Sequence, residues 1–131
     1  MAQDEQSEYT PGVCNIGDAE TQRRRNFGWF TLAISLLLLI ILIWTKVSPW
    51  WRLLIFFPAT MAASGFLQAH FHFCSGFARK GVFNFGSIGK VNRVTDQTSM
   101  QIDQRRGNQI TFYAVLLGLA AAVICVLVHF I

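Results

Sequence analysis

The stretch FGWFTLAISLLLLIILIWTKV, residues 27–47, decides the fold class of this chain. Its 21 residues include a single charged side chain, Lys46, close to the end. At a rise of 1.5 Å per residue, a helix of this length covers about 32 Å, which matches the roughly 30 Å hydrocarbon core of a bilayer. The stretch therefore predicts a transmembrane helix.

Two more apolar stretches follow in the 131-residue chain. The second lies behind the break Ser48-Pro49 and reaches residue 73, although Pro58 should kink it. The third, residues 110–131, carries no charge. We therefore predict an all-α membrane protein with three transmembrane helices. The predicted divisions are an N-terminal segment at 1–26, a transmembrane helical hairpin at 27–73, a loop rich in Gly, Phe and basic residues at 74–109, and the third transmembrane helix at 110–131.

The charge distribution predicts an orientation. Hydrophobic residues make up 53% of the chain and the net charge is +4, but nine of the eleven Lys and Arg residues lie beside apolar stretches, in 23–25 and 79–106. This placement indicates membrane lipid rather than nucleic acid as a partner, because Lys and Arg accumulate on the cytoplasmic side of membrane helices. We expect a multi-pass protein of the bacterial inner membrane with a cytoplasmic N-terminus and loop, and with the C-terminus outside.

Small residues mark the helix faces that should pack. The third stretch has a ridge with four-residue spacing, and the second has a similar strip of alanines. Small side chains let membrane helices approach closely. The residues predicted to pack are Ala114, Gly118 and Ala122 in the third stretch and Ala59 and Ala63 in the second.

Polar residues follow one side of the second stretch. Unpaired polar groups are costly in hydrocarbon, so this line should face other helices or a partner chain. A homo-oligomer or a complex with another membrane protein would supply such a face. A polar pathway for a solute is the competing interpretation. The line consists of Thr60, Ser64, Gln68 and His72.

Cysteine and histidine residues cluster near the end of the second stretch. Cys14 is expected on the same side of the membrane as His70 and Cys74, and these side chains are ligands that zinc, copper or haem iron accept. The three residues form a candidate metal or haem site, or a thiol that carries sulfane sulfur. In the alternative interpretation the chain has no cofactor, the imidazole and aromatic rings form an interfacial belt, and the cysteines only pack.

A motif precedes the first apolar stretch. Asn15, Gly17, Glu20, Arg24 and Gly28 have the spacing N-x-G-x-x-E-x-x-x-R-x-x-x-G. This spacing resembles the opening of the YgaP-type transmembrane domain, a small helical hairpin of the bacterial inner membrane found alone or after a rhodanese sulfurtransferase domain. The resemblance covers about residues 14–81.

The end of the second stretch resembles the same family. The family closes its second helix with C-P-x-Y and a glycine four residues beyond the Tyr. Cys74, Phe77 and Gly81 occupy these positions, whereas Ser75 replaces the Pro and Phe77 the Tyr. The resemblance implies a membrane-embedded hairpin, either monomeric or dimeric, without established catalysis of its own. It does not include the third stretch, and this chain has no rhodanese domain.

The segment between the second and third stretches has three further features. Phe77, Phe83 and Phe85 alternate with basic residues, which suits rings and charges in the lipid headgroup layer. Asp96 can cap a helix that continues into the third stretch. Residues 13–17 and 82–86 share the pattern V-x-N-x-G, which is also typical of an ordinary turn. These features indicate a small non-catalytic scaffold or accessory subunit, with the Cys/His site as the alternative.

Overall fold

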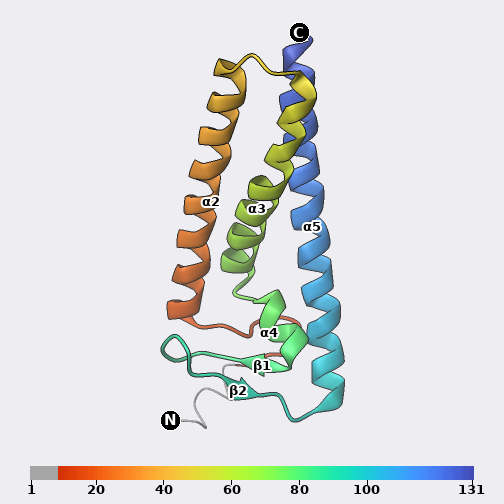
Figure 1. The fold of residues 1–131 in the computed structure, drawn as a ribbon. Coiled ribbons are helices and arrows are strands. Elements are labelled where there is room, and N and C mark those ends of the chain that lie inside the picture. The colour runs from red at the N-terminus through yellow and green to blue at the C-terminus, as the bar shows by residue number, and fades with distance from the viewer. Residues whose placement is uncertain (1–8) are drawn as a thin grey trace.

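The computed structural model describes residues 9–131. Three long helical segments stand side by side, and a small cap of short elements covers one end (Figure 1). The long segments are the helix α2 (Asp18–Trp44), the 3₁₀ helix η1 (Pro49–Ile55) continued by the helix α3 (Phe56–Phe71), and the helix α5 (Gln97–His129). The cap contains the helix α4 (Ser75–Lys80) and the strands β1 (Val82–Phe83) and β2 (Asn92–Arg93), which pair antiparallel.

The predicted class is confirmed in its main feature. The structure is mostly helical, and three segments, α2, Pro49–Phe71 and α5, are long and apolar enough to cross a membrane. In the most apolar 18-residue stretch of each segment, only 17%, 22% and 28% of the residues are buried inside the protein. Most of the apolar surface of the three segments is therefore exposed. The two-residue strands β1 and β2 are a small addition to the all-α prediction.

The two ends of the helices differ in what they carry. The segment before α2 and the whole connection from α3 to α5 lie at one end, which we call the polar end (Figure 1). The short connection from α2 to η1 and the C-terminus lie at the other end. The described N-terminal segment, from Tyr9 on, and the C-terminus therefore lie at opposite ends of the three long helical segments (Figure 1).

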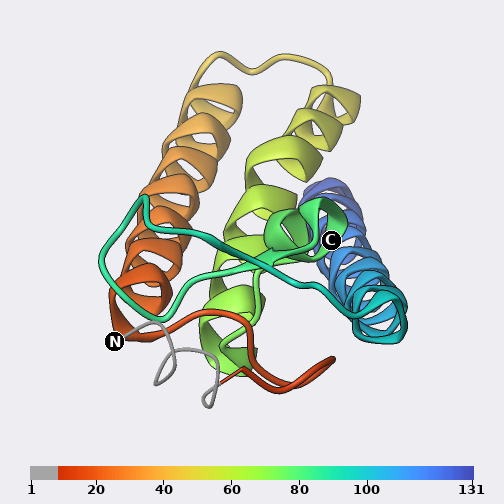
Figure 2. The same cartoon turned by 90° about the horizontal axis from the view of Figure 1, so that it is seen from below.

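The helix α3 packs against both α2 and α5 (Figure 2). The predicted ridge on α5 is buried, and a Cβ atom at Gly118 would lie 2.9 Å from Thr60 Cα. On α3 the buried small residues are Ala62, Gly65 and Ala69, while the predicted Ala59 and Ala63 are only half-buried. The small face of α3 is therefore rotated from the predicted strip, because α3 serves two interfaces.

The glycine Gly65 sets the approach of α3 to α2. A Cβ atom at this position would lie 2.9 Å from both the Arg24 carbonyl oxygen and the Gly28 nitrogen. Gly28 in turn lies against the Phe66 ring, 3.0 Å from where its own Cβ would be. Two glycines that face one another bring the backbones into contact at the polar end of the hairpin.

Two of the long helices begin earlier than the predicted membrane stretches. Helix α2 starts nine residues before position 27, and α5 starts thirteen residues before position 110. The capping role of Asp96 is confirmed, since its side chain accepts hydrogen bonds from Thr98 N and Ser99 N, each at 3.3 Å. The first part of the predicted segment 1–26, residues 1–8, lies outside the described residues.

The helix type changes just before Pro58. Residues Pro49–Ile55 form a 3₁₀ helix, and the α-helix begins at Phe56, so that Pro58 lies in its first turn. Pro58 has no N–H to donate to the Leu54 carbonyl, and this missing hydrogen bond falls at the junction of the two helix types.

Candidate functional site

Two Asn-x-Gly segments meet at the polar end. Ile16 and Asn84 form a parallel bridge, in which Asn84 N donates to the Asn15 carbonyl at 2.9 Å and Gly17 N donates to the Asn84 carbonyl at 2.8 Å. A Cβ atom at Gly17 would lie 2.7 Å from the Phe85 carbonyl oxygen, so this pairing requires a glycine. The two segments that share the V-x-N-x-G pattern therefore lie directly against each other.

The buried side chain of Asn15 holds the turn that follows α3. Its Oδ1 accepts from Cys74 N at 2.6 Å, and its Nδ2 donates to the Cys74 carbonyl at 3.1 Å. Asn15 is fully buried, so the surrounding protein must satisfy its amide. The asparagine thus pairs with both backbone groups of Cys74, whose carbonyl also accepts from Ala78 N at 3.0 Å.

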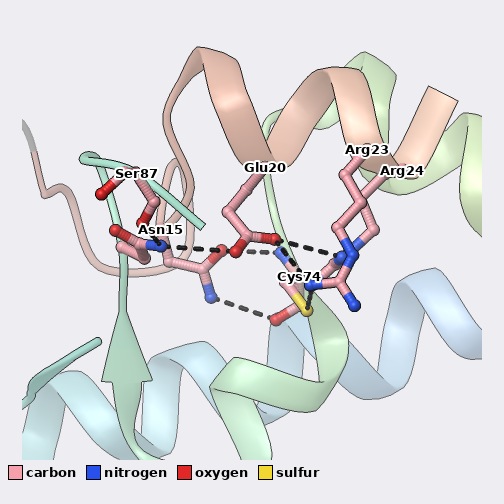
Figure 3. Close-up of polar contacts among 7 residues, drawn as sticks. Asn15, Glu20, Arg23, Arg24, Cys74 and Ser87 are labelled. Atoms are coloured by element: carbon pink, nitrogen blue, oxygen red, sulfur yellow. Dashed lines mark hydrogen bonds and ion pairs between the residues drawn. The ribbon is translucent and has the colours of Figure 1, made fainter. Parts of the chain in front are cut away.

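A buried carboxylate lies next to this pair. Glu20, with 1% of its surface exposed, accepts a hydrogen bond from Asn84 Nδ2 on Oε1 at 3.3 Å. Its Oε2 lies 3.2 Å from Arg24 Nη1, as an ion pair without a well-directed hydrogen bond. Figure 3 shows Glu20 between Asn15 and the two arginines Arg23 and Arg24. A carboxylate this deeply buried requires a cationic partner, and Arg24 provides it.

The same guanidinium reaches the thiol of Cys74. Arg24 Nη2 donates to Cys74 Sγ at 2.9 Å (Figure 3), and the Arg24 guanidinium lies 5.5 Å from the centre of the Phe77 ring. Arg24 therefore links the start of α2 to the chain after α3.

A cavity of about 380 Å³ lies beside this pair of residues. It is formed between the start of α2, the last turns of α3 and the start of α4. Its lining is Arg23, Arg24, Phe27, Gly65, Gln68, Cys74 and Gly76.

The predicted metal ligands do not come together. Within residues 9–131 no group of three His, Cys, Asp or Glu side chains lies close enough to hold a metal ion. Helix α3 ends at Phe71, and His72 takes a left-handed conformation with φ 52°, after which the chain continues into α4. This turn buries Cys74 and leaves His70 exposed beside Phe71. Cys14 lies in a different cavity, of about 420 Å³, which His72 also lines.

The predicted polar line divides into three parts. Thr60 lies against Gly118 of α5, as expected for a residue that faces another helix. Gln68 Nε2 donates to Ser64 Oγ at 2.7 Å, so these two pair along their own helix. His72 leaves the line, because the helix ends before it, and it is exposed.

The three loop phenylalanines differ in their exposure. Phe83 is buried and stacks on Tyr9, with ring centres 4.6 Å apart, whereas Phe77 is half-buried under Arg24 and Phe85 is also half-buried. Phe83 therefore belongs to the core of the cap, and the prediction of a ring in the lipid headgroup layer is wrong for this residue. For Phe77 and Phe85 it stays a prediction.

Sequence reasoning missed the buried carboxylate of Asp103. It accepts a hydrogen bond from Gly12 N at 2.8 Å and another from the hydroxyl of Tyr9, so it fastens the N-terminal segment to α5. Burial, together with the hydrogen bond to Asp103 and the Asp103 charge, raises the pKa of Tyr9 above its ordinary value of 10.0. The signal was present in the sequence, because Asp103 and Gly107 extend the ridge of Ala114 toward the N-terminus of the helix.

A second missed contact lies at the other end. Arg52 Nη1 donates to the Cys125 carbonyl at 2.8 Å, which joins η1 to the last turns of α5. The two residues lie 73 positions apart, so no local sequence pattern indicates this contact.

Comparisons with protein-family models, with curated proteins and with solved structures find no match. The resemblance to the YgaP-type domain therefore stays a prediction. The residues that carry it have defined places in the structure. Asn15, Glu20 and Arg24 form the polar cluster, Gly17 and Gly28 lie at close backbone approaches, and Gly81 takes a left-handed conformation at the end of α4.

Proposed function

We propose that this chain is a multi-pass protein of the bacterial inner membrane, with α2, Pro49–Phe71 and α5 as its spans. The polar end lies in the cytoplasm and the C-terminus outside. The largely apolar surface of the three helices supports their position in the membrane. The orientation is supported by the nine of eleven Lys and Arg residues that belong to the polar end.

Within that membrane the chain acts as a non-catalytic scaffold or accessory subunit through helix–helix interaction. The observation that carries this proposal is a set of buried polar contacts at the polar end that join distant parts of the chain. Glu20 pairs with Arg24 and Asn84, Asn15 pairs with the Cys74 backbone, and Asp103 holds the N-terminal segment. These contacts connect α2, the chain after α3 and α5 at one end of the molecule. The YgaP-type resemblance supports the same function.

The partner is a second copy of the chain or another membrane protein. Exposed apolar residues cover the outer face of α2, including Phe30, Leu37 and Ile41, and this face can pack against a neighbouring helix as well as against lipid.

Crosslinking and mild-detergent purification from native membranes test this function. The combined variant Cys14→Ser, His70→Gln, His72→Asn, Cys74→Ser is expected to retain the partner or dimer of the wild type. Recovery of a monomer without a recurring partner, from both wild type and variant, would contradict the proposal.

Thiol chemistry at Cys74 is the second candidate function, and the 2.9 Å contact between Arg24 and the sulfur favours it. A Cys74 thiolate can attack the outer sulfur of a persulfide. The new S–S bond leaves a persulfide on Cys74, and the donor departs as a thiolate. Mass spectrometry after treatment with a small persulfide donor tests this step. One added sulfur on Cys74 but none on Cys125, with loss of the product in Arg24→Gln, would support it; no added sulfur would exclude it.

A further inference from the structure

The 380 Å³ cavity beside Arg24 has the position of a site for a membrane component. Phe27 is the first residue of the apolar part of α2, and Gly65 and Gln68 belong to the last two turns of α3. The cavity therefore lies where two proposed spans pass from apolar to polar sequence. Its volume is within the roughly 300–1,000 Å³ of small-molecule sites.

The described lining of the cavity is cationic. Two of its residues are charged, Arg23 and Arg24, and none carries a carboxylate. The charge of Arg24 is offset by buried Glu20, 3.2 Å from Nη1. The Arg23 guanidinium lies 4.0 Å from Glu20, and 58% of the Arg23 side chain is exposed. One positive charge thus remains available at the rim of the cavity, which selects an anion.

The polar and apolar parts of the lining lie side by side. Gln68 adds an amide whose Nε2 donates one of its two N–H groups to Ser64, so the other N–H is a donor that a phosphate oxygen can accept. Phe27, 41% exposed, adds an apolar surface next to Arg23. An arginine next to an exposed aromatic ring suits a phosphate group that is attached to a hydrocarbon chain.

We propose that this cavity binds a phosphate group, and that its source is the phosphodiester of an anionic phospholipid. Arg23 forms the direct ion pair with the phosphate. Arg24 stays paired with Glu20 and Cys74 and holds this side of the cavity lining in place. The source of the phosphate rests on the proposed membrane location, whereas the charge and shape of the cavity do not.

The test uses the full-length protein in a neutral mild detergent. Its melting temperature is followed during titration with phosphatidylglycerol, with zwitterionic phosphatidylcholine and with inorganic phosphate. The variant is Arg23→Gln and the matched control is Arg25→Gln, which removes the same charge from an exposed neighbouring position outside the cavity lining. Arg23 is largely exposed, so the substitution leaves the fold intact.

We expect phosphatidylglycerol to raise the melting temperature of wild type and Arg25→Gln saturably. Arg23→Gln should require about tenfold more of this lipid, which corresponds to about 1.4 kcal/mol, and phosphatidylcholine should have no effect. A response to phosphatidylglycerol but not to inorganic phosphate identifies the lipid as the source; an equal response to inorganic phosphate supports the phosphate site and assigns it to the free anion.

Equal responses of Arg23→Gln and Arg25→Gln would overturn the proposal, as would no response to either anion. Fractionation of the same cells separates this failure from a failure of the proposed function. Protein that is found in the membrane but lacks the Arg23 effect contradicts the site alone, and protein in the aqueous fraction contradicts the membrane location.

Discussion

Asn15 and Cys74 are joined by two hydrogen bonds, in which the Asn15 carboxamide pairs with both the N–H and the carbonyl of the Cys74 backbone. The two residues lie 59 positions apart, one before the first long helix and one after the second. This pair therefore closes the α2–α3 hairpin at its polar end. It also holds the Cys74 thiol within reach of Arg24.

Replacement of Asn15 by Ala should destabilise the hairpin. The substitution leaves the buried N–H of Cys74 without a partner, whereas the Cys74 carbonyl keeps its hydrogen bond from Ala78 N at 3.0 Å. We expect a cost of about 1–3 kcal/mol in the free energy of unfolding. Asn108→Ala, at an exposed position of α5, is the control and should show no loss. Unfolding by SDS titration in mixed micelles measures both values, and equal stabilities of the two variants would contradict the role of Asn15.

Replacement of Gly65 by Ala should separate α2 from α3. The added Cβ would meet backbone atoms of Arg24 and Gly28 at 2.9 Å, and backbone cannot rotate away as a side chain can. We expect a loss of about 1–3 kcal/mol, as for other overpacked cores. At Gly76 an added Cβ would meet only Cys74 Sγ, at 3.8 Å, so Gly76→Ala should be tolerated. If the Gly76→Ala variant were less stable than the Gly65→Ala variant, this account of the packing would be wrong.

The hydroxyl of Tyr9 should resist ionisation in the folded protein. Because its pKa is raised by burial and by Asp103, the folded state keeps the proton above pH 10, while the unfolded state loses it. The stabilising effect of Tyr9 is therefore complete below pH 10 and decreases as the pH rises above that value. At about pH 11, near the ordinary Tyr pKa, folded wild type and Tyr9→Phe should show the same phenolate absorbance. An additional phenolate in the wild type would show that Tyr9 is not held by Asp103.

The cap formed by Asp96 should weaken in acid. Its hydrogen bond with the Ser99 side chain, and then the one with Thr98 N, lower the pKa of Asp96 below the ordinary 3.8. The stabilisation of the first turn of α5 is thus present above pH 3.8 and is lost as the pH falls through the lowered pKa. Hydrogen exchange of the amides that follow Asp96 measures it. Asp96→Ala should exchange faster at neutral pH, and Asp96→Asn should be protected at neutral pH without the acid dependence. Identical exchange in wild type and Asp96→Ala would disprove the cap.

The three long helices could be predicted from the sequence because their exposed residues are apolar over the length of a membrane span. The ends of the helices could not be predicted from hydropathy. The first turns of α5 are polar, since they stand against the cap, and only Asp96 marked where the helix begins. The buried ridge of α5 was recognised at Ala114, Gly118 and Ala122, but its polar member Asp103 was missed because a carboxylate is rarely expected on a packing face.

The candidate site required contacts between distant residues. Glu20 and Asn84 are 64 positions apart, and Arg24 and Cys74 are 50 apart, so no local pattern reports these pairings. The repeated V-x-N-x-G pattern was the one available signal for Asn84. The local cluster of His70 and Cys74 suggested shared ligands, but the left-handed turn at His72, which no helix or strand pattern indicates, directs the two side chains to different places.

The accessibility of tags at the two ends of the chain tests the central claim most directly. Tags are placed before Met1 and after Ile131, and a membrane-impermeant reagent is applied to spheroplasts of a bacterium that expresses the chain, before and after lysis. We predict that the protein stays in the membrane fraction, that the tag after Ile131 reacts before lysis, and that the tag before Met1 reacts only after lysis. Protein that remains in the aqueous fraction without detergent, or two tags that react from the same side, would contradict the three-span account.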